Sequence, residues 1–165
     1  MASQRVRATI PKSLTEIWHD VISIAVICVL ILYVGLLWTN VQDIIPIHFN
    51  VAGEVDGWGS KYLMLFLPAT NLLIFSLLSM ISRYPHTFSY PVEITEVNVQ
   101  EKYGLARMML SWLKLEITLL SSYVEWSMMQ VALGERMGLG SWFLPVSFIA
   151  VFGTIGWYFY RLMRK

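Results

Sequence analysis

The chain has 165 residues, of which 56% are hydrophobic and 14% are charged, and its mean hydropathy is +0.58. Ordinary soluble domains are about 45 to 50% apolar and about 25% charged, so the composition excludes a typical water-soluble domain and predicts a large lipid-facing surface. The net charge of +1 provides no field to attract nucleic acid, and the single cysteine excludes an internal disulfide or a cysteine-based zinc site within one chain.

Four stretches of the sequence predict membrane-spanning helices. The first holds an uncharged run from Val21 to Trp38, long enough to cross about 30 Å of hydrocarbon. The second follows Ser60, the expected N-cap, and contains Pro68, which is expected to bend it. The third is the least apolar, and the fourth ends in an aromatic cluster typical of a membrane interface. We therefore expect an all-α integral membrane protein: a single domain over residues 1–165, a four-transmembrane-helix bundle with spans at about 18–38, 61–82, 105–132 and 142–161.

The distribution of Lys and Arg beside these spans predicts the orientation of the chain. Lys61 and Arg136 lie in the first and third loops, whereas nine basic residues lie near the termini and in the middle loop. Cytoplasmic segments carry the excess of basic residues, so the pattern places both termini and the middle loop in the cytoplasm. We expect a multi-pass protein of the cell membrane, and its first expected partner is the lipid bilayer. The segment Trp18 to Asp20 is interpreted as an interfacial anchor at the start of the first span.

The outer loop between the first two spans, residues 40–61, is the segment richest in functional signals. Gly53 permits a tight turn, and Asp56-Gly57 is a strong turn dipeptide, so the loop is expected to fold compactly, with an extended piece around Ile47 to Val51. Its polar side chains either bind a ligand or hydrogen-bond the backbone of the loop itself. No close histidine pair supports a metal site. The candidate ligand-binding residues are His48, Asn50, Gly53, Glu54, Asp56 and Lys61.

The third span carries polar residues on one face, where a charge near the bilayer centre costs about 2.5 to 3.5 kcal/mol. At about 100° per residue this face is a single stripe that should meet other helices, while Glu116 points to the opposite side. The stripe consists of Arg107, Lys114, Thr118, Ser121 and Glu125, with Ser111 at its margin.

Two interpretations of these buried charges remain open. In one, Lys114 and Glu125 extend toward opposite membrane surfaces and have no further role. In the other, Glu116 is paired with a residue such as Asn71 of the second span, or stays protonated, and contributes to a proton or cation pathway. The candidate intramembrane polar residues are Asn71, Lys114, Glu116 and Glu125.

Two motifs of this chain resemble a known family. The outer-loop motif comprises Pro46, His48, Phe49, Asn50, Gly53, Glu54, Asp56, Gly57, Trp58, Ser60 and Lys61. A looser second motif starts at Tyr90-Pro91-Val92 and continues through Arg107 to Lys114. Together they resemble a bacterial and archaeal membrane domain of unknown function found at the N-terminus of Sdp toxin-immunity proteins. The resemblance implies a multi-spanning membrane protein whose relatives protect producing cells from a secreted peptide toxin.

These observations predict a non-enzymatic membrane protein, immunity-like or sensor-like, that recognises an extracellular peptide or an envelope stress. No nucleophile elbow, phosphate loop or cofactor motif occurs in the sequence. The alternative is an ion-coupled permease or a subunit of a membrane transport complex, which with four spans would need a homo-oligomer or another membrane subunit. A membrane enzyme that uses His48, Glu54 and Asp56 ranks last. The expected partners are therefore lipid and a peptide toxin or a second membrane subunit, without a cofactor.

Overall fold

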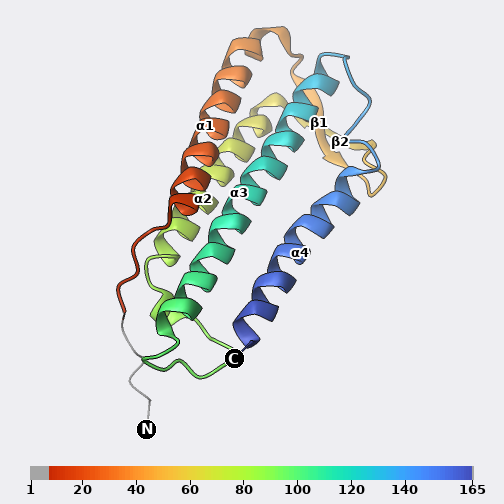
Figure 1. Cartoon of the computed structure of the whole chain (residues 1–165). Helices are drawn as coiled ribbons and strands as arrows, with labels where there is room; N and C mark the ends of the chain where they lie inside the picture. The colour runs from red at the N-terminus through yellow and green to blue at the C-terminus, as the bar shows by residue number, and fades with distance from the viewer. Residues whose placement is uncertain (1–7, 165) are drawn as a thin grey trace.

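Four long helices and one β-hairpin make up the fold (Figure 1), in a computed structural model that describes residues 8–164. The helices are α1 (Leu14–Leu37), α2 (Phe66–Ile81), α3 (Val99–Ala132) and α4 (Phe143–Met163). The strands are β1 (Ile44–Phe49) and β2 (Val55–Ser60). Three short 3-10 helices connect them: η1 (Trp38–Asn40), η2 (Lys61–Leu65) and η3 (Pro85–Thr87).

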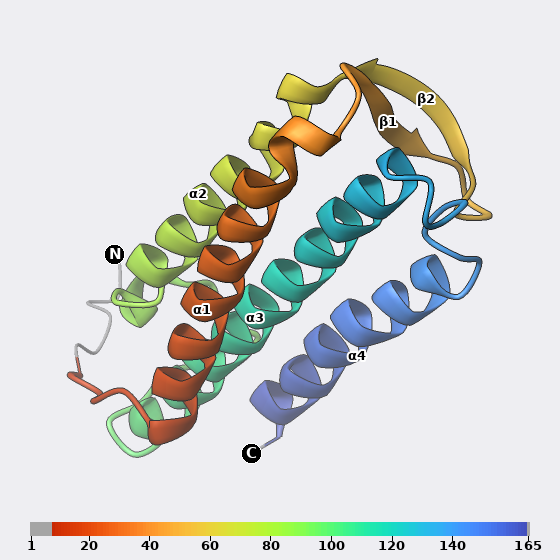
Figure 2. The same ribbon diagram turned by 90° about the horizontal axis from the view of Figure 1, so that it is seen from above.

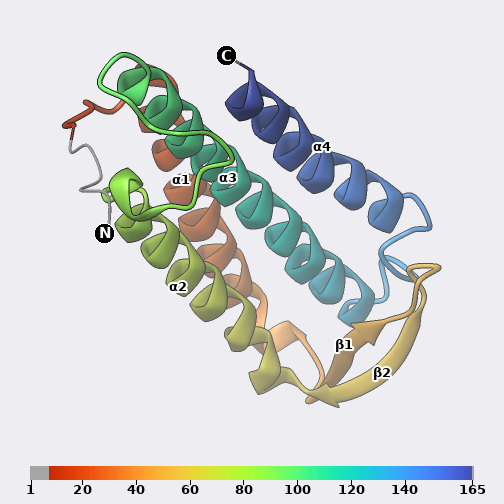
Figure 3. The ribbon, with the colours of Figure 1, turned by 90° about the horizontal axis from the view of Figure 1, so that it is seen from below.

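Helix α3 is the centre of the bundle, because it packs against α1, α2 and α4. Figures 2 and 3 show α1 and α2 together on one side of α3 and α4 on the other side. Helices α1 and α3 run in the same direction, and α2 and α4 run back, so the described chain begins and ends at one end of the bundle (Figure 1). We call this end the terminal end and the opposite one the hairpin end.

Helix α1 begins at Leu14, earlier than the expected start near residue 18. The reason is a capping box: the Ser13 hydroxyl accepts a hydrogen bond from the Glu16 backbone N–H at 3.2 Å, and the Glu16 carboxylate accepts one from the Ser13 N–H at 2.7 Å. The sequence carries this signal as Ser13-Leu14-Thr15-Glu16, so the boundary was predictable. The early start brings one further turn, with Glu16, into the bundle.

Among residues 8–164, three segments are long and apolar enough to cross a membrane: Leu14–Asn40, Lys61–Ile81 and Phe143–Met163. They correspond to the expected first, second and fourth spans and support a membrane protein. Helix α3 is longer than any of them, at 34 residues, but its polar residues keep it outside this set. Those residues lie inside the bundle, as described below.

The outer loop folds into an antiparallel hairpin, which gives the mostly helical fold a small β element. Ile44 pairs with Ser60 and Ile45 with Gly59, and the register becomes irregular after Pro46. The expected extended piece around Ile47 to Val51 overlaps β1, although the strand starts three residues earlier.

An apolar core closes the hairpin end of the bundle. It joins side chains of α1, β1, η2 and α3, and Ile45 and Met129 within it are completely buried. The buried members are Val34, Val41, Ile45, Met64, Met128 and Met129. The hairpin is therefore part of the packed structure rather than a free loop.

The hairpin turn is also docked against the segment that leads into α4. The Leu139 N–H donates to the Gly53 carbonyl at 2.7 Å, and Glu54 forms a bridge with Gly138. Gly53 has a φ of 78°, and a Cβ atom there would lie 2.6 Å from the Gly140 carbonyl oxygen. Only glycine allows this close approach of two backbones.

We predict that Gly53→Ala destabilises the protein by more than about 1 kcal/mol, because it combines a left-handed conformation with a backbone clash. Gly104→Ala is the matched control, since Gly104 lies inside α3 with open space where its Cβ would be. That change should leave stability unchanged or raise it by about 0.5 to 1 kcal/mol. Denaturant unfolding in detergent measures both; equal stability of the two variants would contradict the docking.

Candidate functional site

The buried face of α3 is a nearly continuous line of polar side chains, which we call the polar line. Its members follow one another at intervals of three or four residues, so they share one side of the helix. All of them are buried: Arg107, Ser111, Lys114, Thr118, Ser122 and Glu125. The predicted stripe is thus confirmed, except that Ser122 takes the place of Ser121, which is only half-buried and donates back to the Ile117 carbonyl.

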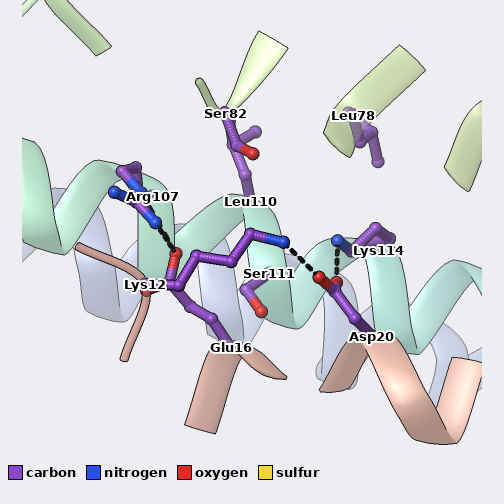
Figure 4. Close-up of a pocket in the computed structure, with 9 residues that line it drawn as sticks. All are labelled: Lys12, Glu16, Asp20, Leu78, Ser82, Arg107, Leu110, Ser111 and Lys114. Carbon is purple, nitrogen blue, oxygen red and sulfur yellow. Dashed lines mark hydrogen bonds and ion pairs between the residues drawn. The ribbon is translucent and has the colours of Figure 1, made fainter. Parts of the chain in front are cut away.

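At the terminal end, the polar line begins with a buried ion pair. The Arg107 guanidinium donates from Nε and from Nη2 to the Glu16 carboxylate, at 3.1 and 2.9 Å. It also donates to the Ile10 carbonyl, ahead of α1. Two such groups inside a bundle are tolerated because each neutralises and hydrogen-bonds the other. Figure 4 shows this pair beside a second one, which shares the same small pocket.

The second pair joins Lys114 to Asp20 of α1 (Figure 4). The Lys114 ammonium also donates to the Ser79 hydroxyl of α2 at 3.0 Å, so one side chain connects three helices. Lys12 reaches the other oxygen of Asp20 at 2.5 Å. The interpretation that Lys114 merely extends to the membrane surface is wrong, because its side chain is 5% exposed and paired inside the bundle.

His19 lies in the same layer. Its Nδ1 is 2.9 Å from the Ser111 hydroxyl, and its ring meets the edge of Trp112 at 4.4 Å between centroids. The expected interfacial anchor at Trp18 to Asp20 is therefore wrong for His19 and Asp20, whose side chains point into the bundle. Glu16, His19 and Asp20 are the site residues that sequence reasoning missed. Their spacing of three and four residues on one helical face was a usable signal.

Farther toward the hairpin end, the polar line meets Asn71 of α2. The Asn71 amide donates to the Thr118 carbonyl and to the Ser122 hydroxyl, both at 3.4 Å. The Asn71 Oδ1 and the Ser23 hydroxyl of α1 are buried without a hydrogen-bond partner among the described residues. This middle layer is polar and uncharged.

The two glutamates that are predicted to lie within the membrane have different surroundings. Glu116 faces α4, where the Thr154 hydroxyl donates to its Oε1 at 2.5 Å. Its location opposite the polar line is as predicted, but its partner is Thr154 and not Asn71. Glu125 belongs to the polar line, is 1% exposed, and neither of its oxygens has a hydrogen-bond partner in the described chain. The interpretation that Glu125 extends to the outer membrane surface is therefore wrong.

The hairpin brings two of the predicted ligand-binding residues together on its exposed side. The His48 Nδ1 and the Asp56 carboxylate are 2.5 Å apart, and the two side chains are 71% and 43% exposed. Trp58 of β2 is also exposed, and Val51 at the turn is 84% exposed. The hairpin thus presents an acid–imidazole pair and apolar groups to the medium, without burying any of them in its own fold.

The other predicted loop residues have structural partners. The Asn50 Oδ1 accepts from the backbone N–H of Ala52 and of Glu54, at 2.9 and 3.0 Å, and its amide donates to the Glu54 carboxylate. This arrangement is an Asx turn, which fixes the chain reversal. Gly53 serves the docking described above.

Lys61, the last of the candidate loop residues, pairs with Asp43 at 3.0 Å and lies over the Trp38 ring. It therefore joins the base of the hairpin to the end of α1. In the described residues 8–164, no three His, Cys, Asp or Glu side chains come together as metal ligands.

One comparison with known proteins gives a match. A family model described as a domain of unknown function (DUF1648) matches residues 24–72. This segment contains most of α1, the whole hairpin and the first turns of α2, but not the motif that begins at Tyr90. No curated protein and no solved structure matches the chain. The hairpin and the helices on either side of it are therefore the part that this chain shares with the family model.

We predict that the hairpin residues separate into two classes by their effect on stability. His48→Ala should change the free energy of unfolding by less than about 1 kcal/mol, because exposed ion pairs contribute little. Asn50→Ala should cost about 1 to 3 kcal/mol, because it leaves the Ala52 and Glu54 N–H groups without their acceptor. Thermal unfolding in detergent compares the two. A large loss for His48→Ala would show that His48 is needed for folding and is not a free surface group.

Proposed function

We propose that the chain is a non-enzymatic, multi-pass cell-membrane protein that recognises an extracellular peptide or an envelope-stress signal through its hairpin, as an immunity-like or sensor-like protein would. The observation that supports this proposal best is the combination of a rigidly docked hairpin with an exposed His48–Asp56 pair. Because the exposed His48–Asp56 pair is expected to contribute little to the stability of the fold, its side chains are free to contact a ligand.

We infer that α3 is the fourth span of the bundle. It has 34 residues, and at 1.5 Å per residue it is about 50 Å long, enough for the hydrocarbon layer and the interfaces. Arg107 and Lys114 are paired with Glu16 and Asp20 of α1, and Glu116 is bonded to Thr154 of α4. Glu125 is 1% exposed and therefore also turned away from lipid. Because lipid meets little of the polar surface, a helix of low hydropathy is compatible with the membrane.

The hairpin is suited to peptide recognition by its position and its chemistry. Exposed apolar groups, Val51 and Trp58, lie near a carboxylate and an imidazole, so the surface offers both hydrophobic contact and hydrogen bonding. Each strand of a two-stranded sheet also has a free edge, which an extended peptide is able to join through its backbone. With both termini in the cytoplasm, as the basic residues predict, this surface faces the outside of the cell.

A specific observation favours a second candidate, the ion-coupled permease or transport-complex subunit. The polar line extends from the Glu16–Arg107 pair through most of the bundle to Glu125, and ionisable residues inside membrane spans mark ion and proton routes. The bundle has four long helices, so a transport function would require a homo-oligomer or another membrane subunit.

We predict that a peptide library displayed on phage yields binders of the nanodisc-embedded protein that depend on the hairpin surface. Peptides selected on the unmodified protein should bind His48→Ala and Asp56→Asn variants much more weakly, since these changes remove the exposed pair without unfolding the hairpin. Glu96→Gln is the matched control, because it removes an exposed carboxylate from the loop before α3, at the terminal end.

Binding to the Glu96→Gln variant should equal binding to the unmodified protein, and all variants should have nearly the same melting temperature. Peptides that bind all variants alike, or a selection that enriches none, would contradict recognition by the hairpin. In that case the permease interpretation would be the one left to test.

A further inference from the structure

Glu125 is the most unusual side chain of the bundle. It is 1% exposed, and both its carboxylate oxygens lack a hydrogen-bond partner among the described residues. Burying an ionised carboxylate without partners in an apolar interior costs several kcal/mol of folding free energy. The group must therefore be neutral or hold a cation.

The neighbouring elements provide no positive side chain for Glu125. Helix α2 contains no ionisable residue between Phe66 and Ile81. Lys114 lies about 16 Å away along the helix axis and is paired with Asp20. Arg136 contacts Tyr123, Trp126 and Ser127, which lie about 100 to 200° round α3 from Glu125.

Other ionisable groups of the helices and of the hairpin base either have partners or lie at the far end of the bundle. On α1, Tyr33 donates to Gln130, and Glu16, His19 and Asp20 are at the terminal end. At the hairpin end Lys61 is paired with Asp43, and on the far side of α3 Glu116 is bonded to Thr154. No basic side chain among the described residues is therefore placed to pair with Glu125, and a proton is the simplest positive charge that would neutralise it.

Access to Glu125 differs between the two ends. Toward the hairpin end, one turn farther along α3, lies the apolar core of Met129, Met64 and Ile45, all completely or almost completely buried. Toward the terminal end, the polar line continues through Ser122 and Thr118. Asn71 and Ser23 add buried oxygens that lack partners and are thus free to accept a hydrogen bond from water or a moving proton.

The polar line then reaches the Lys114–Asp20 pair, where Asp20 also contacts Lys12. The Lys12 side chain is 44% exposed, so this end is in contact with the medium. From the terminal end to Glu125, buried polar side chains thus occur at every turn of α3, whereas the turn beyond Glu125 packs into the apolar core.

We propose that Glu125 is an intramembrane proton-binding site, which exchanges its proton with water at the terminal end through the polar line. The proton leaves a hydronium ion at that end, and an O–H bond forms on one oxygen of the Glu125 carboxylate, which becomes a neutral carboxylic acid. The reverse step returns the proton to water. The site is independent of peptide recognition, because none of its residues belongs to the hairpin surface.

Infrared spectra of the protein in lipid nanodiscs test this proposal. At neutral pH the unmodified protein should show the carbonyl band of a neutral carboxylic acid, and Glu125→Gln should lose it. Glu125→Asp, which keeps a carboxyl group, should retain a shifted band. Transfer into D2O should shift the band of the unmodified protein, and Thr118→Val should slow that shift, since it interrupts the polar line without touching Glu125.

Glu116→Gln is the control, because Glu116 is a half-buried carboxylate on the opposite face of α3. It should leave the Glu125 band and its exchange unchanged. The proposal is wrong if Glu125→Gln and Glu125→Asp both leave the neutral carboxyl region as it was, or if the band does not respond to D2O. A Glu125 carboxylate band that shifts on addition of Na+ would identify a metal-cation site and would also overturn it.

Discussion

The architecture depends on one constraint: the charges of α3 must be neutralised inside the bundle. Arg107 and Lys114 are buried, and they are tolerated because α1 places Glu16 and Asp20 against them. This complementarity fixes which face of α1 meets α3 and at what height. It also explains why a helix too polar to count as a span by composition forms the centre of the fold.

At the opposite end of the bundle, the hairpin closes the helix interior with apolar side chains. Ile45 of β1 and Met64 of η2 complete an apolar core with Met129, and this core separates the polar line from the medium on that side. The close approach of Gly53 to the segment before α4 then holds the hairpin in place. One face of the hairpin thus closes the bundle, while the side chains of His48 and Asp56 on the hairpin remain exposed.

Much of this was predictable from periodicity. The apolar runs predict the three apolar spans, and the 100° spacing predicts both the buried stripe of α3 and the position of Glu116 on the opposite side of that helix. Partners were not predictable: Lys114 was expected to reach the surface, and Asp20 was placed at the interface. Two residues of different helices pair only if they lie at the same height in the bundle. That height depends on where each helix starts and how it tilts, and the tilt is set by tertiary packing. The capping box at Ser13 is a local sequence signal that extends α1 over Glu16.

The coupling between Glu16 and Arg107 tests the central claim most directly. Glu16→Gln and Arg107→Met each leave one buried charge unpaired and should cost about 3 to 5 kcal/mol, whereas the double variant should cost much less than their sum. A double-mutant cycle of unfolding in detergent measures this. We predict strong coupling; effects that add within about 0.5 kcal/mol would show that the charges of α3 are not neutralised by α1.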